Sequence, residues 1–423
     1  MLRLIKISLV LILFAFGTAA VYGADTDETY FEFLKTNYNK HDKKLNDFLK
    51  AELHLFLELY PTSEFAGEAS YLLAQAYLDS RDENEAFAIL MKTLYLYPDG
   101  AMHTAVTAEA QRIVAKNGSY KKKQEELRKI INGEFENGAV EDRYYRYLKF
   151  LRELNDKKLY DWTLDEYYYF IDRFDDDDRI ERIHRWVADM YASKGDAQAA
   201  VAGYHKYEKL FPVNKNLPYV IINRANVLNE DLKEYALASS LLTQVIDDYP
   251  DTKYASSAMY SRAGIKADRL RDYNGAIADY RQLLTRHPQH EKAVDALFEI
   301  ADLNARRLKA FRAAIDNYNE VVEKYPDSPR GVEALKNSAE LYLKIDDYIS
   351  AAKQYARAEE VYPENEETPA LLYEAGDIAL GKMKDYQQAK DYYSRVVEKY
   401  PSSDYAVKAR QKVTKINEKL GEQ

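Results

Sequence analysis

The sequence predicts an all-α protein, a helical solenoid (superhelix) built from roughly ten helix-turn-helix repeats of 37–38 residues. The first observation is spacing: from Pro212 to Pro401, prolines that follow an aromatic residue or a histidine recur every 37 or 38 residues. The second is repetition, because the stretch 321–328 returns almost letter for letter at 396–403. The third is periodicity, since small and apolar residues recur three or four positions apart between the prolines, as on one helix face. Such units stack on one another, so the chain length does not require several globular domains.

The composition fits helices and excludes several classes of function. The chain of 423 residues is 47% hydrophobic and 31% charged, and its 15 glycines and 11 prolines leave little material for long flexible linkers. Its 60 lysines and arginines stand against 70 aspartates and glutamates, for a net charge of −10, so nucleic-acid binding has little electrostatic support. The absence of cysteine excludes disulfides, thiolate metal ligands and cysteine nucleophiles.

Residues 1–24 have the features of a signal peptide. Arg3 and Lys6 form a positive start, an apolar run follows from Ile7 to Phe16, and small residues up to Ala24 offer cleavage sites. We therefore expect secretion across the inner membrane, with no transmembrane span after cleavage. The bacterial periplasm is the expected compartment, and peripheral attachment to a membrane is an alternative. An uncleaved anchor is another alternative, but the apolar run is shorter than the ~20 residues that span a bilayer.

Residues 25–174 are predicted to form degenerate copies of the repeat. Two copies close on Tyr60-Pro61 and Tyr97-Pro98. Further on, the junctions weaken to Phe135-Glu136 and Phe174-Asp175 without losing the spacing. We interpret this region as diverged repeats, and a hinge or an inserted binding face is the alternative.

Residues 175–401 are the clear part of the array. In the second helix of a repeat, a small residue is followed four positions later by tyrosine, which places both on one helix face. The small residue allows a close helix crossing, and the ring fills the space beside it. These pairs are Ala276 and Tyr280, Ala314 and Tyr318, and Ala351 and Tyr355. Proline ends each unit because it cannot continue a helix, and the Asp or Ser after it is expected to cap the next helix. Residues 402–423 add a capping helix with a charged outer face.

No pattern in the chain predicts a catalytic, cofactor or metal site. The stretch from Gly376 to Met383 resembles a phosphate loop, but it lacks the final Ser or Thr and follows no predicted strand. His287 and His290 could offer two metal ligands, yet His287 stands where other repeats have the junction tyrosine. The acidic run 175–178 could bind calcium, but nothing completes an EF-hand loop, and we interpret it as a solvated helix cap. We expect no enzyme and no cofactor.

The repeat pattern resembles the tetratricopeptide repeat (TPR). That family has a small residue and a tyrosine in the first helix, a small-aromatic-small series in the second, and then proline. Two repeats that fit in order contain Ala188, Tyr191, Ala200, Tyr204 and Pro212, and Ala339, Tyr342, Ala351, Tyr355, Ala358 and Pro363. The departure is the period, 37–38 residues against about 34 in the family.

The long repeat, together with the signal peptide, is similar to TPR proteins of the bacterial cell envelope. Examples are the periplasmic coordinator of the Tol-Pal system and the TPR lipoprotein of the outer-membrane β-barrel assembly machine. This chain differs from them in having neither a cysteine to carry a lipid nor an N-terminal heptad run.

The resemblance implies a non-enzymatic scaffold that binds protein or peptide partners in the cell envelope. It suggests a place in envelope assembly, in the Tol-Pal system or in division-related complexes. In this family the first helices line a groove, which implies contacts from the residues at those positions. They are Arg182, Arg185, Asp189, Asn223, Ser261, Asp268, Arg269, Arg306 and Arg307. The alternative for each is an ordinary solvated helix face.

Tyrosine is abundant, with 38 residues, and most fall on positions that pack within a repeat. The four that do not are candidates for an exposed aromatic surface: Tyr144, Tyr145, Tyr168 and Tyr169. Such a surface would suit an alternative function as a peptidoglycan- or glycan-binding module, or as a non-catalytic relative of a superhelical lytic cell-wall enzyme. A lytic enzyme itself would need a separate catalytic domain, and the repeats extend to within about twenty residues of the end.

Overall fold

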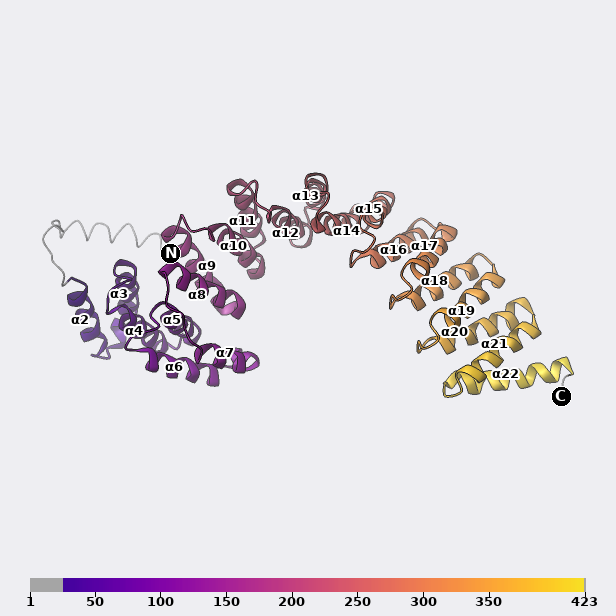
Figure 1. Cartoon of the computed structure of the whole chain (residues 1–423), viewed down its shortest axis with the longest axis horizontal. Coiled ribbons are helices and arrows are strands. Elements are labelled where there is room, and N and C mark those ends of the chain that lie inside the picture. Colours follow the sequence, from indigo (N-terminus) through magenta and orange to yellow (C-terminus); the bar gives the residue numbers. More distant parts are fainter. Residues whose placement is uncertain (1–25, 422–423) are drawn as a thin grey trace. The chain divides into compact units, whose positions relative to one another are not determined.

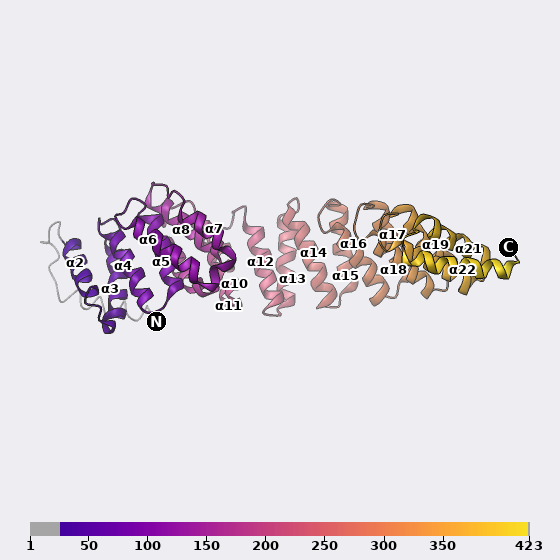
Figure 2. The ribbon, with the colours of Figure 1, turned by 90° about the horizontal axis from the view of Figure 1, so that it is seen from below.

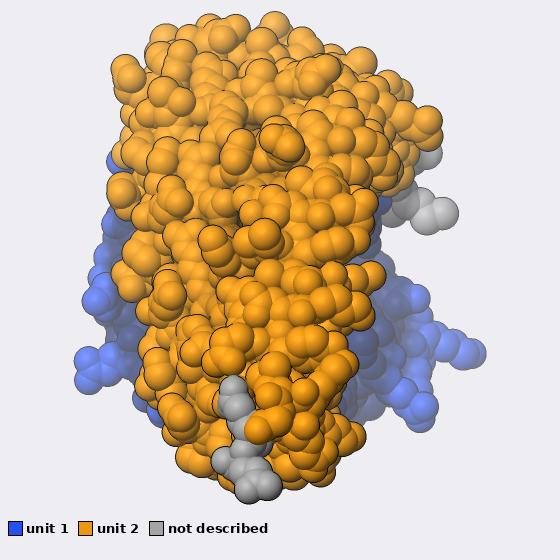
Figure 3. All heavy atoms as spheres, turned by 90° about the vertical axis from the view of Figure 1, so that its right-hand side faces the viewer, with its two compact units in different colours: residues 1–196 blue, residues 197–423 orange. Residues whose placement is uncertain are grey.

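The computed structural model describes residues 26–421, and within this range every regular element is a helix. The predicted all-α solenoid of stacked helix pairs is therefore confirmed. The chain divides into two compact units, Met1–Asp196 (unit 1) and Ala197–Gln423 (unit 2), which Figure 3 shows in different colours. The predicted signal peptide lies outside the described residues. The predicted boundary at 174/175 concerns the clarity of the repeats and stays a prediction.

Unit 1 contains the degenerate repeats and the first helix of the clear array (Figure 1). Its α-helices are α2 (Thr26–Tyr38), α3 (Asn46–Leu59), α4 (Ala66–Asp79), α5 (Glu83–Leu96), α6 (His103–Lys116), α7 (Gln124–Ile131), α8 (Val140–Leu154), α9 (Tyr160–Arg173) and α10 (Ile180–Lys194). Short 3-10 helices are η2 (Lys43–Leu45), η3 (Gly118–Lys123) and η4 (Lys157–Leu159).

Unit 2 is regular, and Figure 2 shows its consecutive helices lying side by side. The first helices of its repeats are α12 (Leu217–Glu230), α14 (Lys253–Asp268), α16 (Ala293–Asp302), α18 (Gly331–Lys344), α20 (Thr368–Ile378) and α22 (Asp404–Leu420). The second helices are α11 (Ala197–Leu210), α13 (Tyr235–Asp248), α15 (Tyr273–Arg286), α17 (Phe311–Lys324), α19 (Tyr348–Val361) and α21 (Tyr386–Lys399). Two π-helical segments, η5 (Leu303–Arg307) and η6 (Ala379–Met383), extend α16 and α20.

The two repeat lengths originate in the turn between the two helices of a repeat. In the 38-residue repeat that ends at Pro288, a backbone hydrogen bond spans six residues, from Asp272 N to Lys266 O at 2.8 Å. In the 37-residue repeat that ends at Pro363, the corresponding bond spans five, from Asp347 N to Tyr342 O at 3.0 Å. The wide turn recurs in the other 38-residue repeats, from Glu234 to Leu228, Ala310 to Asn304 and Asp385 to Ala379. One residue in this turn thus separates the two periods.

The junction between repeats uses the polar residue two positions after the proline. Ser328 accepts a hydrogen bond from the backbone N–H of Arg330 at 3.2 Å, and the next helix starts one residue later. This side chain therefore shapes the turn that precedes the helix. The residue at this position caps the helix itself at Thr252 and at Ser403, and of these two only Ser403 is of a predicted type, Asp or Ser.

The predicted packing positions are buried. Ala351 is fully buried and Tyr355 is 6% exposed, and the equivalent pairs of the neighbouring repeats are buried in the same way. Gly376, inside α20, shows why small residues are needed at a crossing, because a Cβ there would lie 2.6 Å from the ring of Tyr393. The stretch that resembles a phosphate loop therefore begins at a helix crossing.

The third repeat leaves the regular stack of unit 1. Helix α5 packs against both α6 and α8, while α7 packs on α6. Tyr120, in η3, fills the space beside α6 and lies 4.8 Å from the ring of Phe87 on α5. The diverged sequence between 99 and 135 thus forms a side pair, and α8 takes the place next to α5.

Candidate binding surfaces

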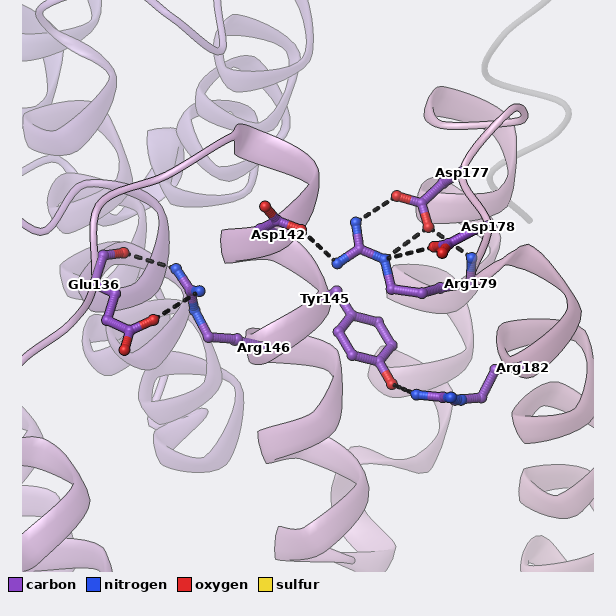
Figure 4. Close-up of polar contacts among 8 residues, drawn as sticks. All are labelled: Glu136, Asp142, Tyr145, Arg146, Asp177, Asp178, Arg179 and Arg182. Carbon is purple, nitrogen blue, oxygen red and sulfur yellow. Dashed lines mark hydrogen bonds and ion pairs between the residues drawn. The ribbon is translucent and has the colours of Figure 1, made fainter.

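Residues of the predicted groove and of the predicted aromatic surface meet in unit 1, between α8 and α10. A guanidinium nitrogen of Arg182 donates a hydrogen bond to the Tyr145 hydroxyl at 2.5 Å (Figure 4). The Tyr145 ring stacks on Trp186, with centroids 5.5 Å apart and an interplanar angle of 15°. The Arg179 guanidinium lies 4.8 Å from the centre of the Tyr145 ring. Residues 37 positions apart are thus joined because α8 and α10 are neighbouring first helices.

The acidic run 175–178 serves the start of α10. Asp177 accepts the backbone N–H of Arg179 at 2.8 Å and also pairs with its guanidinium, which holds the pKa of the Asp177 carboxyl below its usual range (Figure 4). Arg179 reaches back to Asp142 on α8 at 2.7 Å. Asp177 therefore closes the turn that precedes α10, as Ser328 does before α18, and the N-cap residue of α10, Arg179, makes no side-chain cap hydrogen bond.

The other predicted groove residues of α10 are tied to neighbours. Asp189 pairs with Arg152 of α8 at 3.0 Å, and Arg185 lies 4.0 Å from Asp189. The Arg152 guanidinium in turn lies 5.0 Å from the centre of the Trp186 ring. Arg182 is the exposed member of the set, so it is the residue of this surface best placed to meet a partner.

The prediction that Tyr144 is exposed is wrong. Its side chain is 2% exposed, stacks on Tyr169 at 5.2 Å and donates a hydrogen bond to Glu166. Tyr145 and Tyr169 are half-buried, and Tyr168, at 42%, is the exposed one of the four. Tyr144 turns inward because α8 packs between α5 and α9, a placement that follows from the displaced third repeat.

A buried ion pair that the sequence did not indicate lies at the centre of unit 1. The ammonium of Lys92, on α5, is 2.8 Å from the carboxylate of Glu166 on α9, whose side chain is 8% exposed. Rings of Tyr144, Tyr169 and Tyr147 surround this ammonium at 4.9, 5.3 and 6.0 Å. The two charged residues are 74 positions apart, so no local pattern could have paired them.

Aromatic residues extend this packing to α3 and α4, near the start of unit 1. Trp162, on α9, donates a hydrogen bond to the Tyr147 hydroxyl at 2.9 Å. Its ring lies 5.9 Å from those of both His54 on α3 and Tyr77 on α4. The space between α3, α4, α5, α8 and α9 is thus filled by the unit's own side chains.

The predicted groove residues of unit 2 fall into two groups. Asn223 and Ser261 are half-buried at the middle of α12 and α14, whereas Asp268, Arg269, Arg306 and Arg307 are exposed near the ends of first helices.

Two of these arginines join a ladder of cations over aromatic rings. Arg269 lies 5.6 Å from the ring of Tyr235, and Arg307 lies 5.8 Å from the ring of Tyr273. In both contacts the tyrosine belongs to the second helix of the repeat that precedes the arginine. The ladder continues with Lys344 over Phe311, Lys382 over Tyr348 and Lys419 over Tyr386. These contacts link neighbouring repeats beside the turns between their first and second helices.

Four first helices of unit 2 also present exposed carboxylates, which define the first-helix face. They are Asp268 on α14, Glu299 on α16, Glu340 on α18 and Glu374 on α20. Partial burial, together with the charges of Asp302 and Asp268, raises the pKa of Glu299 above its usual range. Of these four, only Asp268 belongs to the groove residues predicted from the sequence. On α16 and its extension η5 the predicted residues, Arg306 and Arg307, lie seven and eight positions after Glu299, and none was predicted on α18 or α20.

The described residues give no support to a metal site or a membrane span. Over residues 26–421, no three His, Asp or Glu side chains are grouped as a metal site would need. His290 accepts the backbone N–H of Lys292 at 3.1 Å, in the junction turn that other repeats close with Ser or Asn. In the same range, no helix has the length and apolar character of a bilayer span.

These helix pairs, with their buried small residues and tyrosines and their polar first-helix faces, define a TPR solenoid. Two tetratricopeptide-repeat family models match the chain, at residues 67–99 and 261–329. The model of YfiO, an outer membrane lipoprotein family, matches residues 307–423. The chain therefore contains tetratricopeptide repeats and a YfiO-like domain, and the resemblance seen in the sequence is confirmed. Both families are generally non-catalytic scaffolds for protein interactions.

Several solved structures resemble this chain over part of its length. A tetratricopeptide repeat protein from Parabacteroides merdae is 15% identical and covers 66% of this chain and 99% of its own, with a TM-score of 0.38. PilW, a type IV pilus biogenesis factor, is 17% identical and covers 54% and 97%, with a TM-score of 0.32. Pseudomonas aeruginosa PilF is 13% identical and covers 55% and 98%, with a TM-score of 0.33. Because these TM-scores are low, the fold assignment rests on the helix pairs and the family models. No curated protein matches the chain in sequence.

Proposed function

We propose that this protein is an exported, non-enzymatic scaffold of the bacterial cell envelope that binds protein or peptide partners. The periplasm is its proposed compartment, and envelope assembly, the Tol-Pal system and cell division are the processes in which its complexes would act. The match of residues 307–423 to an outer membrane lipoprotein family supports the location, and the signal-like residues 1–24 support export.

The observation that carries the proposal is the first-helix face of unit 2. Its four carboxylates, one on each of four successive first helices, are exposed, and among residues 26–421 they have no ion-pair partner. The second helices meanwhile supply buried tyrosines to the core. A face that repeats the same kind of charge from helix to helix suits an extended protein segment, which can contact each repeat in turn.

Binding of peptidoglycan or another glycan has weaker support. The aromatic surface on which it depends is mostly packed into unit 1, since Tyr144 is buried and Tyr145 is stacked on Trp186. Rings used in this way cannot offer their faces to a sugar.

The test compares two binding assays on the full-length chain. The chain, tagged at its C-terminus, is incubated with an envelope extract and crosslinked, and in parallel it is sedimented with purified peptidoglycan. We expect a retained protein partner and no sedimentation. Sedimentation without a protein partner would favour the glycan function, and retention of neither would contradict both. A fusion of residues 1–24 to a reporter enzyme that is active only outside the cytoplasm checks export.

A further inference from the structure

Four tyrosines at equivalent positions of unit 2 differ in what their hydroxyls contact. Tyr318 donates a hydrogen bond to Asp302, and Tyr393 donates one to Asp377 at 2.6 Å. In each case the carboxylate stands 16 positions earlier, on the first helix of the same repeat. At that position the other two repeats have Gly264 and Ala339, so Tyr280 and Tyr355 lack this acceptor.

Tyr280 is a buried polar side chain without a hydrogen-bond partner. It is 3% exposed, and among residues 26–421 its hydroxyl has no partner. The hydroxyl faces α14, since a Cβ added at Gly264 would lie 3.9 Å from it. Helix α15, which carries Tyr280, packs on both α14 with Asp268 and α16 with Glu299. Burial raises the pKa of Tyr280, and the charges of these two carboxylates raise it further.

Tyr355 repeats this arrangement two repeats later. It is 6% exposed, and within the described residues its hydroxyl likewise has no hydrogen-bond partner. Helix α19, which carries Tyr355, packs on both α18 with Glu340 and α20 with Glu374. Burial raises the pKa of Tyr355 to about 12, and the two carboxylates contribute to this rise. Each of these two sites therefore combines a largely buried tyrosine, whose hydroxyl makes no hydrogen bond within the described residues, with two exposed carboxylates, one from the same repeat and one from the next.

In the last repeat, which has Asp377 at the position of Gly264 and Ala339, the chain itself places an amine on the first-helix face. Lys412, from the last helix α22, places its ammonium 2.7 Å from Asp377, with the rings of Tyr373 and Tyr393 at 5.9 and 5.8 Å. A carboxylate beside tyrosine rings is thus occupied by an amine when the next helix supplies one. A cation gains from both partners, through the ion pair and through the electron-rich ring faces.

We propose that the first-helix face of unit 2 binds a lysine- or arginine-bearing segment of a partner protein. One cationic side chain lies between Asp268, Glu299 and Tyr280, and a second lies between Glu340, Glu374 and Tyr355. This inference rests on the proposed scaffold function and names the chemistry of the partner. The like charges gathered on the face repel one another, and a basic segment relieves that repulsion on binding.

The experiment measures binding of a fluorescein-labelled 15-residue peptide, three copies of Lys-Gly-Ser-Arg-Gly, to the full-length chain by fluorescence anisotropy. A peptide with Glu in place of Lys and Arg is the control ligand. We expect the basic peptide to bind and the acidic one not to bind. Because exposed charges are screened by salt, affinity should fall about tenfold between roughly 50 and 300 mM NaCl.

Variants locate the site. Glu299→Gln with Glu374→Gln removes one carboxylate from each site, and we expect about tenfold weaker binding, since each change removes a charge-assisted contact. Glu366→Gln with Glu398→Gln removes two exposed carboxylates elsewhere in unit 2 and should leave affinity unchanged. Tyr280→Phe keeps the ring but removes the hydroxyl, so it should weaken binding by a smaller factor.

Several outcomes would overturn the inference. Equal weakening by the two double variants would mean that only net charge matters. Binding of the acidic peptide, or no binding of the basic one, would exclude a cation site on this face. A partner retained from envelope extract equally by the wild type and by Glu299→Gln with Glu374→Gln would leave the scaffold function standing and remove this site. Failure to retain any partner would count against the scaffold function instead.

Discussion

The two units use the same kind of helix pair in opposite ways. In unit 1, side chains from α3, α4, α5, α8 and α9 meet around the Lys92 ammonium and fill the space between them. In unit 2, four successive first helices each keep a carboxylate exposed, unpaired within residues 26–421, and pack through other side chains. The difference arises at the third repeat, whose displacement brings α8 onto α5. One irregular repeat therefore converts a repetitive surface into a closed core.

The largest effect on stability is expected from removing the ion pair at the centre of unit 1. Lys92→Met should destabilise unit 1 by about 3 kcal/mol, because removing one partner of a buried ion pair leaves the Glu166 carboxylate uncompensated. Chemical denaturation measures this loss of stability. In hydrogen exchange, the variant should accelerate exchange more in α8 and α9 than in unit 2.

Lys149→Met is the matched control, since its ion pair with Glu153 is long, at 3.7 Å, and exposed on both sides. It should change stability by less than about 0.5 kcal/mol. If Lys92→Met were equally mild, the filled centre would not be what stabilises unit 1.

The next effect concerns the helix crossings of unit 2. Ala351→Leu should cost about 1 to 3 kcal/mol, because the site is fully buried and a larger side chain overfills the crossing. Lys353→Leu, on the same helix but exposed, should leave the melting temperature nearly unchanged. Identical melting curves for the two variants would contradict the assigned crossing.

A smaller effect is expected at the ladder that fastens the turns of unit 2. Arg307→Ala removes a cation from above the Tyr273 ring and should cost roughly 0.5 to 1 kcal/mol, the range for an exposed contact of this kind. Arg312→Ala removes an exposed arginine from the following helix, and in the described chain Arg312 lies over no ring. Urea denaturation should separate the two variants, and equal midpoints would show that the ladder adds nothing.

The smallest effect is a pH dependence of unit 2. Partial burial, followed by neighbouring carboxylates, raises the pKa of both Glu299 and Glu374, so the folded state binds more protons than the unfolded state just above the usual carboxyl pKa of 4.5. Stability should therefore fall as pH rises through this window. Glu299→Gln with Glu374→Gln should remove the fall and stabilise the chain at neutral pH, by less than about 1 kcal/mol because both groups are partly exposed. If the stability of wild type and variant changed with pH in parallel, the effect assigned to these neighbouring carboxylates would be contradicted.

Local features of the repeat could be predicted because they depend on neighbours along one helix. Ala351 and Tyr355 are four positions apart, and the spacing alone places them on one buried face. The same logic failed for Tyr144, because its burial depends on which helix packs against α8. The groove positions implied by the family resemblance also did not include Glu299 or Glu374, since a general family pattern does not fix which side chains of a particular helix are exposed.

By itself, the sequence determined that this chain is a stack of paired helices and that small residues lie at the crossings. These properties follow from short-range periodicity, from proline and from side-chain size. Only the tertiary structure decided that Lys92 and Glu166 meet, that the third repeat stands aside, and that Tyr280 and Tyr355 are buried between helices that carry exposed carboxylates. Those contacts join residues from different helices, and their energies depend on burial and distance, which no local pattern encodes.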